Sequence, residues 1–322
     1  MTRAKLLFFI QMICLCYGIE QVSPPWGFVF KDWAGDPLDV IIYIPSGAHK
    51  ETKILMVVPG ASRDTQRFHA SWLSYAKEDT FVVITIGASK KYFPDEYSYN
   101  SGNVITSKGE SIDSSEWLFT AIEKVFLTVK KRHGFEADKF YLFGHSAGGG
   151  LVHLYMLFMP DAPVEKAVSA NPAFVTLPDR SEDYPFGLKN MPINSAMMRH
   201  WLESDLGIFL GANDIGPRTQ PLSNGTKAKK QGPNCLARGK KLYREAKSAA
   251  KNRNINFGWT LKIVPRVGHD NRLIAPHARN FLFHITFFSL CLVHPHLQFF
   301  IFFFGEGPPG ANSAFFFFNE RT

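Results

Sequence analysis

The stretch KFYLFGHSAGGGLVHLYM, residues 139–156, places a serine between glycines at the junction of two apolar runs. The run before the serine is short and aromatic, which favours a buried strand. The run after it is apolar nearly all round, which favours a buried helix. Residues 144–148, GHSAG, fit the pattern G-x-S-x-G. In a strand–turn–helix setting this pattern is typical of a nucleophilic serine on a sharp turn, here Ser146.

The glycines around Ser146 have a steric role. A serine in such a turn adopts a strained backbone, and β-carbons two residues away on either side would collide with the neighbouring strand and helix. The helix that begins just beyond also favours a developing negative charge at its N-terminus. The alternative is a glycine-rich strand–helix turn without chemistry, so the residues downstream bear on the choice.

The other apolar runs predict an α/β fold. Short β-branched runs predict further strands at residues 39–45, 54–58, 81–86, 166–170, 206–214 and 259–265. Amphipathic or wholly apolar stretches predict helices at residues 114–133, 151–159, 235–251 and 271–283. Strands that alternate with helices indicate a mainly parallel central sheet with helices on both faces. Chemistry in such a sheet gathers at the carboxyl ends of the strands.

A serine hydroxyl needs a base to take its proton, and the base must itself be oriented. In α/β enzymes with this turn, an acid and then a histidine follow the serine along the chain. Asp214 ends the strand-like run LGIFLGAND and is our candidate acid, whereas Asp205 precedes that run. His269 follows the last predicted strand within VGHDN and is our candidate base. His277 is the nearest rival, but it falls in the helix that follows.

Two further histidines, His145 and His153, are not candidates for the base. His145 lies inside the turn, and His153 lies on the buried helix, where a histidine is typically a hydrogen-bonded core residue.

The oxyanion hole requires two backbone N–H donors aimed at one point. We expect one from Ala147 and the other from Ala61, with Gly60 allowing close backbone approach. An ordinary Pro-Gly turn is the alternative at Gly60.

These motifs together resemble the α/β-hydrolase superfamily from about residue 39 to residue 283. Within it, the sequence looks most like serine esterases related to polyhydroxybutyrate depolymerases and feruloyl esterases. The resemblance rests on VVPGASRDTQRF, GHSAGG, LGANDIGPR, QGPNCLARGKKLY and VPRVGHDN. It implies hydrolysis of a small-molecule or polymeric carboxylic ester through an acyl-enzyme, with no cofactor and no metal. It does not fix the substrate, because this fold hosts many reactions.

Two alternatives to an esterase remain open at this point. A serine peptidase could use the same three residues. A non-catalytic relative could bind a ligand or a glycan, and it would be recognised by a missing residue among Ser146, Asp214 and His269. None of the three is missing, which favours catalysis. Residues 171–198, rich in Pro, Asn and Asp, are expected to form a loop or lid over the carboxyl edge of the sheet.

The N-terminal residues 1–18, MTRAKLLFFIQMICLCYG, predict a cleaved secretory signal. Their positive start precedes an apolar run too short to span a bilayer comfortably, and a buried helix or an uncleaved anchor is the alternative. We therefore expect a secreted protein whose domain covers residues 19–283. Asn224 opens an Asn-Gly-Thr glycosylation triplet. The 4 cysteines do not form a disulfide framework.

Two regions do not follow from the hydrolase pattern. Much of the net charge of +8 lies between residues 218 and 253, which indicates either attraction to an anionic surface or a solvated helix face. No nucleic-acid module accompanies this charge, so we expect no nucleic-acid partner.

Residues 284–322 are rich in Phe, and His294-Pro295-His296 splits them into halves too short to span a membrane. We expect a non-native tail, and membrane association only if the tail is a genuine anchor.

Overall fold

The computed structural model describes residues 26–216, 222 and 225–283. Within them a single eight-stranded sheet runs in the order β1-β2-β4-β3-β5-β6-β7-β8. The two strands at one edge are antiparallel to their neighbours, and all the pairs from β4 to β8 are parallel. The strands are β1 (Trp26–Phe30), β2 (Leu38–Tyr43), β3 (Ile54–Val58), β4 (Val82–Gly87), β5 (Phe140–His145), β6 (Val164–Ala170), β7 (Leu206–Gly211) and β8 (Thr260–Val264).

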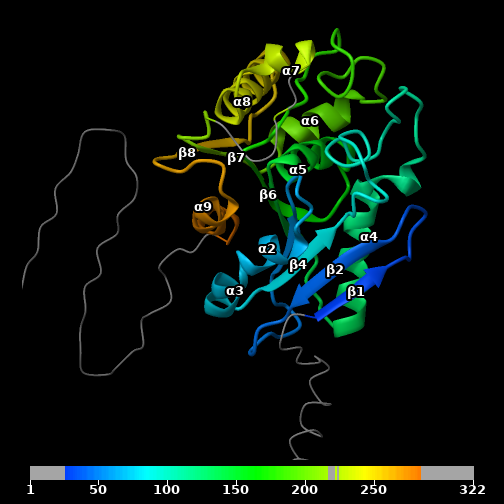
Figure 1. The fold of residues 1–322 in the computed structure, drawn as a ribbon, viewed down its shortest axis with the longest axis vertical. Coiled ribbons are helices and arrows are strands. Elements are labelled where there is room, and N and C mark those ends of the chain that lie inside the picture. Colours follow the sequence, from blue (N-terminus) through cyan, green and yellow to red (C-terminus); the bar gives the residue numbers. More distant parts are fainter. Residues whose placement is uncertain (1–25, 217–221, 223–224, 284–322) are drawn as a thin grey trace, which may run out of the picture. The chain divides into compact units, whose positions relative to one another are not determined.

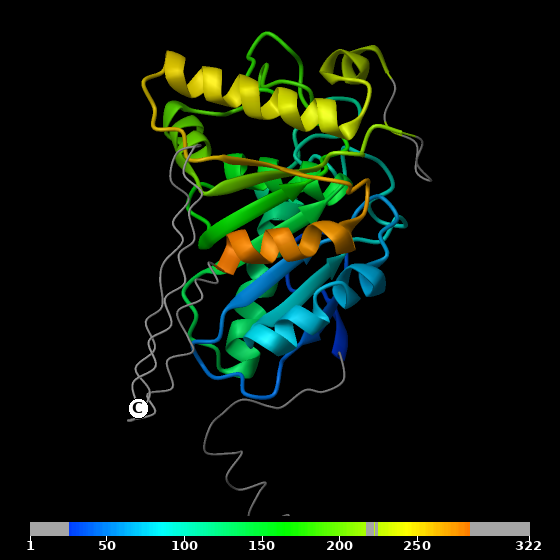
Figure 2. The ribbon, with the colours of Figure 1, turned by 90° about the vertical axis from the view of Figure 1, so that its left-hand side faces the viewer.

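Helices cover both faces of this sheet. Figure 2 shows α9, α2 and α3 on the face toward the viewer, and in Figure 1 α4, α5 and α6 lie on the opposite side. The predicted fold class, a mainly parallel sheet between two helical layers, is confirmed. The helical segments are α2 (Thr65–Ala70), α3 (Leu73–Asp79), η1 (Ser114–Glu116), α4 (Leu118–His133), α5 (Ala147–Phe158), α6 (Ser195–Glu203), α7 (Thr226–Gln231), α8 (Cys235–Asn252) and α9 (Asn271–Phe283).

Successive side chains of the central strands point to opposite faces of the sheet, so they contribute to two separate apolar cores. In β3, Met56 packs into the core under α4, α5, α6 and α8, whereas Val57 faces the core under α3 and α9. All five residues of β3 are buried, as expected for a strand covered on both faces. The strand is therefore a continuous apolar run without polar alternation, and this pattern made it predictable.

Several boundaries differ from the predicted ones. The predicted helix at residues 114–133 is divided into η1 and α4, because Trp117 between them has an extended backbone. Helix α5 begins at Ala147, four residues earlier than expected, since glycines carry no hydrophobic signal. Strand β1 was not predicted: it is an edge strand with exposed positions and a weak apolar pattern. Helices α2, α3, α6 and α7 were also missed, and each has nine residues or fewer.

The segment at residues 171–198 has no regular element until α6 begins at Ser195. Many of its side chains are buried, among them Val175, Thr176 and Leu188.

The predicted signal at residues 1–18, Asn224 and the tail at residues 284–322 lie outside the described residues. Among the helices that the structure describes, none has the length and apolarity needed to cross a membrane.

Two buried histidines should make the fold sensitive to acid. His69 contacts the Thr85 hydroxyl at 2.9 Å, and His153 Nε2 accepts the Thr176 N–H at 3.0 Å. Burial lowers the pKa of each imidazole from 6.5 to about 4. The unfolded chain therefore takes up protons first as the pH falls. The stability that the neutral imidazoles provide is complete above pH 6.5 and is lost as the pH approaches 4.

We expect the free energy of unfolding to fall between pH 6.5 and about 4. The loss should be on the order of 3 kcal/mol for each histidine. Urea denaturation across this range measures it. His69→Gln cannot take up a proton here and should reduce the loss by about half. A profile that is flat in the parent protein would contradict the prediction.

Candidate active site

Ser146 occupies a strained turn between β5 and α5. Its φ of 60° and ψ of −116° lie in a region that residues with a β-carbon rarely adopt. The turn is fixed by two backbone hydrogen bonds, from Ser146 N–H to Ala170 O at 2.9 Å and from Ala173 N–H to Ser146 O at 3.1 Å. Such strain persists only where the surrounding structure holds it, and it is typical of functional sites.

The flanking glycines are required by close backbone contacts. A β-carbon at Gly144 would overlap the carbonyl of Gly148, and one at Gly148 would overlap the carbonyls of Val58 and Pro59. Helix α5 thus lies directly against the ends of β3 and β5. The steric reason given for the G-x-S-x-G pattern holds in this structure.

Asp214 and His269 are joined by a short hydrogen bond. His269 Nδ1 lies 2.7 Å from Asp214 Oδ2, and the carboxylate is buried whereas the imidazole is partly exposed. Backbone hydrogen bonds tie the two loops together: Ala212 N–H donates to Val264 O, and Asn213 N–H donates to Val267 O. The turn after β7 and the loop after β8 are therefore held in one register, which fixes the separation of the two side chains.

The rival residues lie elsewhere. Asp205 stands at the start of β7, at the opposite edge of the sheet, where it pairs with Lys166 at 3.4 Å. His277 lies on α9. His153 is fully buried on α5 and hydrogen-bonded at both ring nitrogens, as predicted for a core histidine. Of the candidates that the sequence offered, Ser146, Asp214 and His269 are thus the ones that lie at the carboxyl edge of the sheet.

The loop after β3 brings the expected second oxyanion donor against the turn. A β-carbon on Gly60 would lie 3.3 Å from Ser146 Cβ, so this loop touches the serine. Tyr99 is buried and donates its hydroxyl to Pro59 O at 2.6 Å. The Arg63 guanidinium stacks on the Tyr99 ring, 3.3 Å from its centroid, and donates to the Ala88 and Phe93 carbonyls. No sequence pattern indicated these supports of the loop.

Asn171 connects three strand ends and was also missed as a site residue. It follows β6 directly, is fully buried and has a left-handed backbone, with φ of 43°. Its amide oxygen accepts the Gly211 N–H at 2.7 Å. Its amide nitrogen lies 3.3 Å from both His145 Nε2 and Gly268 O. The His145 ring in turn packs against the His269 ring at 4.5 Å between centroids.

Asn171 therefore positions the neighbours of the candidate base rather than touching a reacting atom. It holds the turn after β7 through Gly211, the loop of His269 through Gly268, and the ring beside the base through His145. Only its place at the carboxyl end of a predicted strand could have suggested this role from the sequence.

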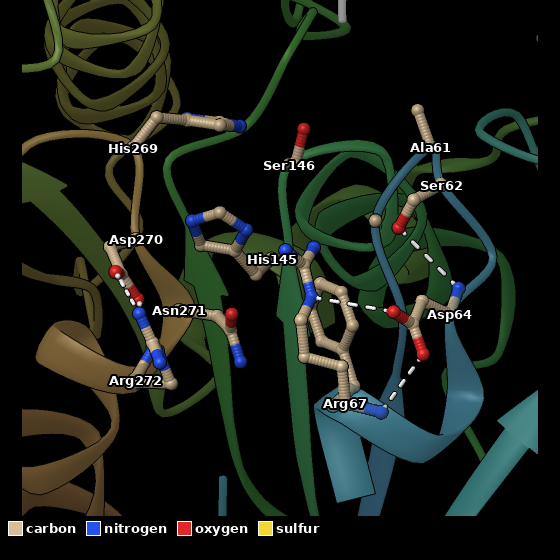
Figure 3. Close-up of a pocket in the computed structure, with 12 residues that line it drawn as sticks. Ala61, Ser62, Asp64, Arg67, His145, Ser146, His269, Asp270, Asn271 and Arg272 are labelled. Carbon is tan, nitrogen blue, oxygen red and sulfur yellow. Dashed lines mark hydrogen bonds and ion pairs between the residues drawn. The ribbon is translucent and has the colours of Figure 1, made fainter. Parts of the chain in front are cut away.

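A pocket of about 320 Å³ contains Ser146 and His269. In Figure 3 the His269 ring extends toward the Ser146 side of the pocket, with the His145 ring below both. The other lining residues are Gly60, Ala61, Ser62, Asp64, Arg67, Phe68, Asp270, Asn271 and Arg272. This lining contains no residue from the segment 171–198.

The pocket charges are paired. Arg67 lies 3.7 Å from Asp64, and Arg272 lies 3.1 Å from Asp270 (Figure 3). Burial alone would raise the pKa of the Asp270 carboxyl, but hydrogen bonds from Arg272 lower that pKa below its ordinary value. The two acidic and two basic residues of the lining therefore balance in charge.

One group of side chains could hold a metal ion. Ligand atoms of Asp214, Cys235 and His269 lie within 4.8 Å of one another, and this is the group of that kind found in the described part of the chain. Two of its three members are the candidate acid and the candidate base.

Two solved structures are similar to this chain over most of its length. Poly(aspartic acid) hydrolase-1 from Sphingomonas sp. KT-1 is 35% identical, with a TM-score of 0.78, over 81% of this chain and 99% of that chain. The poly(3-hydroxybutyrate) depolymerase LpqC from Bordetella parapertussis is 27% identical, with a TM-score of 0.76, over 82% and 91%. This chain belongs to the α/β-hydrolase superfamily of esterases. The predicted resemblance is confirmed.

A more distant α/β-hydrolase, an S-formylglutathione hydrolase from Agrobacterium tumefaciens, shares the fold at 16% identity and a TM-score of 0.53. The match covers 82% of this chain and 96% of that chain. No protein-family model matches the chain, and no curated protein matches it either. The similar structures are those of hydrolases and esterases, which supports an enzyme with ester or polymer substrates.

The role of Asn171 can be tested with Asn171→Gly. Glycine keeps the left-handed backbone without strain but removes the amide, so the change isolates the side-chain hydrogen bonds. We expect kcat on an activated ester to fall about ten- to a hundredfold, because misplacement of a catalytic group by about 1 Å has this effect. KM should change little, since Asn171 does not line the pocket.

Asn190→Gly is the matched control, because Asn190 is also left-handed, with φ of 61°, but exposed. It should retain the parent kcat. An Asn171→Gly variant with unchanged kcat, or with a loss confined to KM, would show that the amide does not position the base.

Proposed function

We propose that this protein is a serine hydrolase that cleaves carboxylic esters through an acyl-enzyme intermediate. Ser146 is the proposed nucleophile, His269 the general base and Asp214 the residue that orients it. The observation that supports this most strongly is the 2.7 Å hydrogen bond between His269 Nδ1 and buried Asp214, with His269 in the same pocket as the strained Ser146.

In the proposed first step, Ser146 Oγ attacks the acyl carbon of the substrate while His269 Nε2 takes the hydroxyl proton. Asp214 favours this because its carboxylate accepts a hydrogen bond from the Nδ1–H group. That bond leaves Nε2 unprotonated and able to act as a base, and it stabilises the imidazolium that forms. The carboxylate is 3% exposed, so the hydrogen bond is little weakened by water.

The tetrahedral intermediate places negative charge on the former carbonyl oxygen. The N–H of Ala147 is available to it, because the first N–H groups of a helix have no acceptor within the helix. Ala61 N–H, on the loop that Tyr99 and Arg63 support, is the proposed second donor. The N-terminus of α5 adds a favourable dipole. His269 then gives its proton to the leaving alcohol, and water releases the acid by the same steps in reverse order.

The nucleophile can be tested by labelling with a serine-directed fluorophosphonate. The full chain should become labelled at Ser146 and lose esterase activity in proportion. Ser146→Ala should not be labelled, and its kcat should fall by about a millionfold, as for removal of a catalytic serine in similar triads. Ser62→Ala, at another pocket serine, is the matched control and should label normally. Equal labelling of Ser146→Ala and the parent would overturn the assignment.

A second candidate function is amide hydrolysis. It is favoured by the similarity to poly(aspartic acid) hydrolase-1, because poly(aspartic acid) is an amide-linked polymer. The same serine, base and oxyanion donors would act, and the general acid would have to protonate an amine rather than an alcohol. The polar lining of the pocket, which contains paired charges, suits a polar polymer as well as an ester.

An ester and an amide with the same acyl group would separate the two functions. We expect the ester to be hydrolysed with the higher kcat/KM and the polymer poly(3-hydroxybutyrate) to release acid. Release of aspartyl fragments from poly(aspartic acid), at a rate that exceeds cleavage of every ester, would favour the second function. Loss of both activities in Ser146→Ala would assign them to one site.

The remaining expectations are part of this proposal. We propose that residues 19–283 form the catalytic domain, that residues 1–18 direct secretion and are removed, and that Asn224 is glycosylated. The segment at residues 171–198 is the proposed lid, and residues 284–322 are proposed to be dispensable for the reaction. The signal-like sequence supports the assignment of residues 1–18, and the Asn-Gly-Thr triplet supports that of Asn224.

A further inference from the structure

Three side chains that bind transition metals meet at His269. Asp214, Cys235 and His269 each offer one ligand atom, and these atoms all lie within 4.8 Å of one another. Asp214 and Cys235 are buried, and the His269 side chain is 23% exposed at the pocket wall. The three residues come from the turn after β7, the first residue of α8 and the loop after β8.

The backbone holds these three elements together. Leu236 N–H, next to Cys235, donates to Asp214 O at 3.4 Å, which joins the start of α8 to the turn after β7. The Asn234 side chain caps α8 by accepting the Ala237 N–H at 2.8 Å. The loop of His269 is joined to the same turn through Asn213 and Val267. The cluster is thus built by the fold and does not depend on flexible surface side chains.

The donor set identifies the class of ion. A thiolate and an imidazole with one carboxylate are ligands that Zn²⁺ binds, whereas Mg²⁺ and Ca²⁺ prefer oxygen alone. Zinc bonds of about 2.0–2.3 Å place tetrahedral ligand atoms about 3.3–3.6 Å apart. His269 Nδ1 and Asp214 Oδ2, now 2.7 Å apart, must therefore separate slightly. The partly exposed His269 ring has room on its pocket side for this movement.

We propose that Asp214, Cys235 and His269 form an inhibitory binding site for Zn²⁺. The ion would bind Nδ1, the imidazole nitrogen that now faces the carboxylate. A neutral imidazole bound to metal through Nδ1 carries its proton on Nε2 and cannot accept a proton there. The bound ion would therefore block the base. The binding stands without the proposed hydrolysis, whereas the inhibition rests on it.

The binding step balances without any other reagent. The imidazole proton moves from Nδ1 to Nε2, the Cys235 thiol gives its proton to solvent, and Asp214 binds as the carboxylate. Water takes the fourth position, as in zinc sites with three protein ligands. A chelator that removes the ion reverses each of these changes, so the inhibition is reversible.

Cobalt replaces zinc as a visible probe of binding. The full chain, in buffer free of chelators and thiols, should develop a sulfur-to-cobalt charge-transfer band and the visible bands of a tetrahedral ion when titrated with Co²⁺. Ser146→Ala should give the same spectrum, because the serine is not a ligand. The absence of a sulfur-to-cobalt band in the parent protein would overturn the proposal.

Variants test whether the cobalt charge-transfer band comes from the cluster of Asp214, Cys235 and His269. Cys235→Ala should lose the charge-transfer band, and Cys235→Ser, of similar size, supplies the same comparison if the alanine variant does not fold. His277→Ala is the matched control and should keep the spectrum, because His277 lies on α9 away from the cluster. A band that persists in Cys235→Ala and Cys235→Ser would come from another cysteine and would overturn the assignment.

Inhibition is measured separately. The concentration of Zn²⁺ that halves hydrolysis should rise about tenfold or more in Cys235→Ala, with each variant compared with its own metal-free rate. A chelator should restore the parent rate. Cobalt binding through Cys235 with no effect of Zn²⁺ on hydrolysis would overturn the inhibitory role. A protein that cleaves neither esters nor amides overturns the proposed function, and the cobalt spectrum still decides whether the site binds metal.

Discussion

Helix α5 approaches the ends of β3 and β5 so closely that no β-carbon fits at Gly144 or Gly148. This contact fixes the direction in which the chain leaves β5, and it forces Ser146 into its strained, left-handed conformation. The helix N-terminus then points at the space above the serine. A larger residue at either glycine would move the helix, and the serine, the dipole and the first oxyanion donor would move with it.

The positions of the candidate acid and the candidate base depend on a second constraint, the register between β7 and β8. The parallel pairing continues beyond the strands through the Ala212–Val264 and Asn213–Val267 hydrogen bonds. Since these bonds join the two loops directly, Asp214 and His269 meet although 55 residues separate them in the sequence. Asn171 extends the same constraint to β6 and β5, so each strand end that carries a site residue is connected to its neighbour.

A buried carboxylate beside a histidine has more than one chemical consequence. In the proposed reaction it orients an imidazole and stabilises its protonated form. Together with the nearby Cys235 sulfur, the same pair would supply the three ligands of the proposed transition-metal site. The two uses exclude each other. The proposed reaction needs a proton on Nδ1 of His269, whereas the metal ion needs the lone pair of the same nitrogen. The proposed reaction and the proposed inhibition therefore compete for one nitrogen.

The sequence by itself determined the fold class and the candidate reacting residues. Buried parallel strands such as β3 are uninterrupted apolar runs, and the residues that follow them share one edge of the sheet, so Ser146, Asp214 and His269 could be placed along the chain. The edge strand β1 and the short helices were missed, because a half-exposed strand and a single helical turn have weak patterns. Tertiary structure alone decided that Tyr99 and Arg63 support the loop after β3, that Asn171 joins three strand ends, and that Cys235 lies beside Asp214. These are contacts between residues far apart in sequence, and hydrophobic periodicity reports which face a residue occupies but not which distant residue it meets.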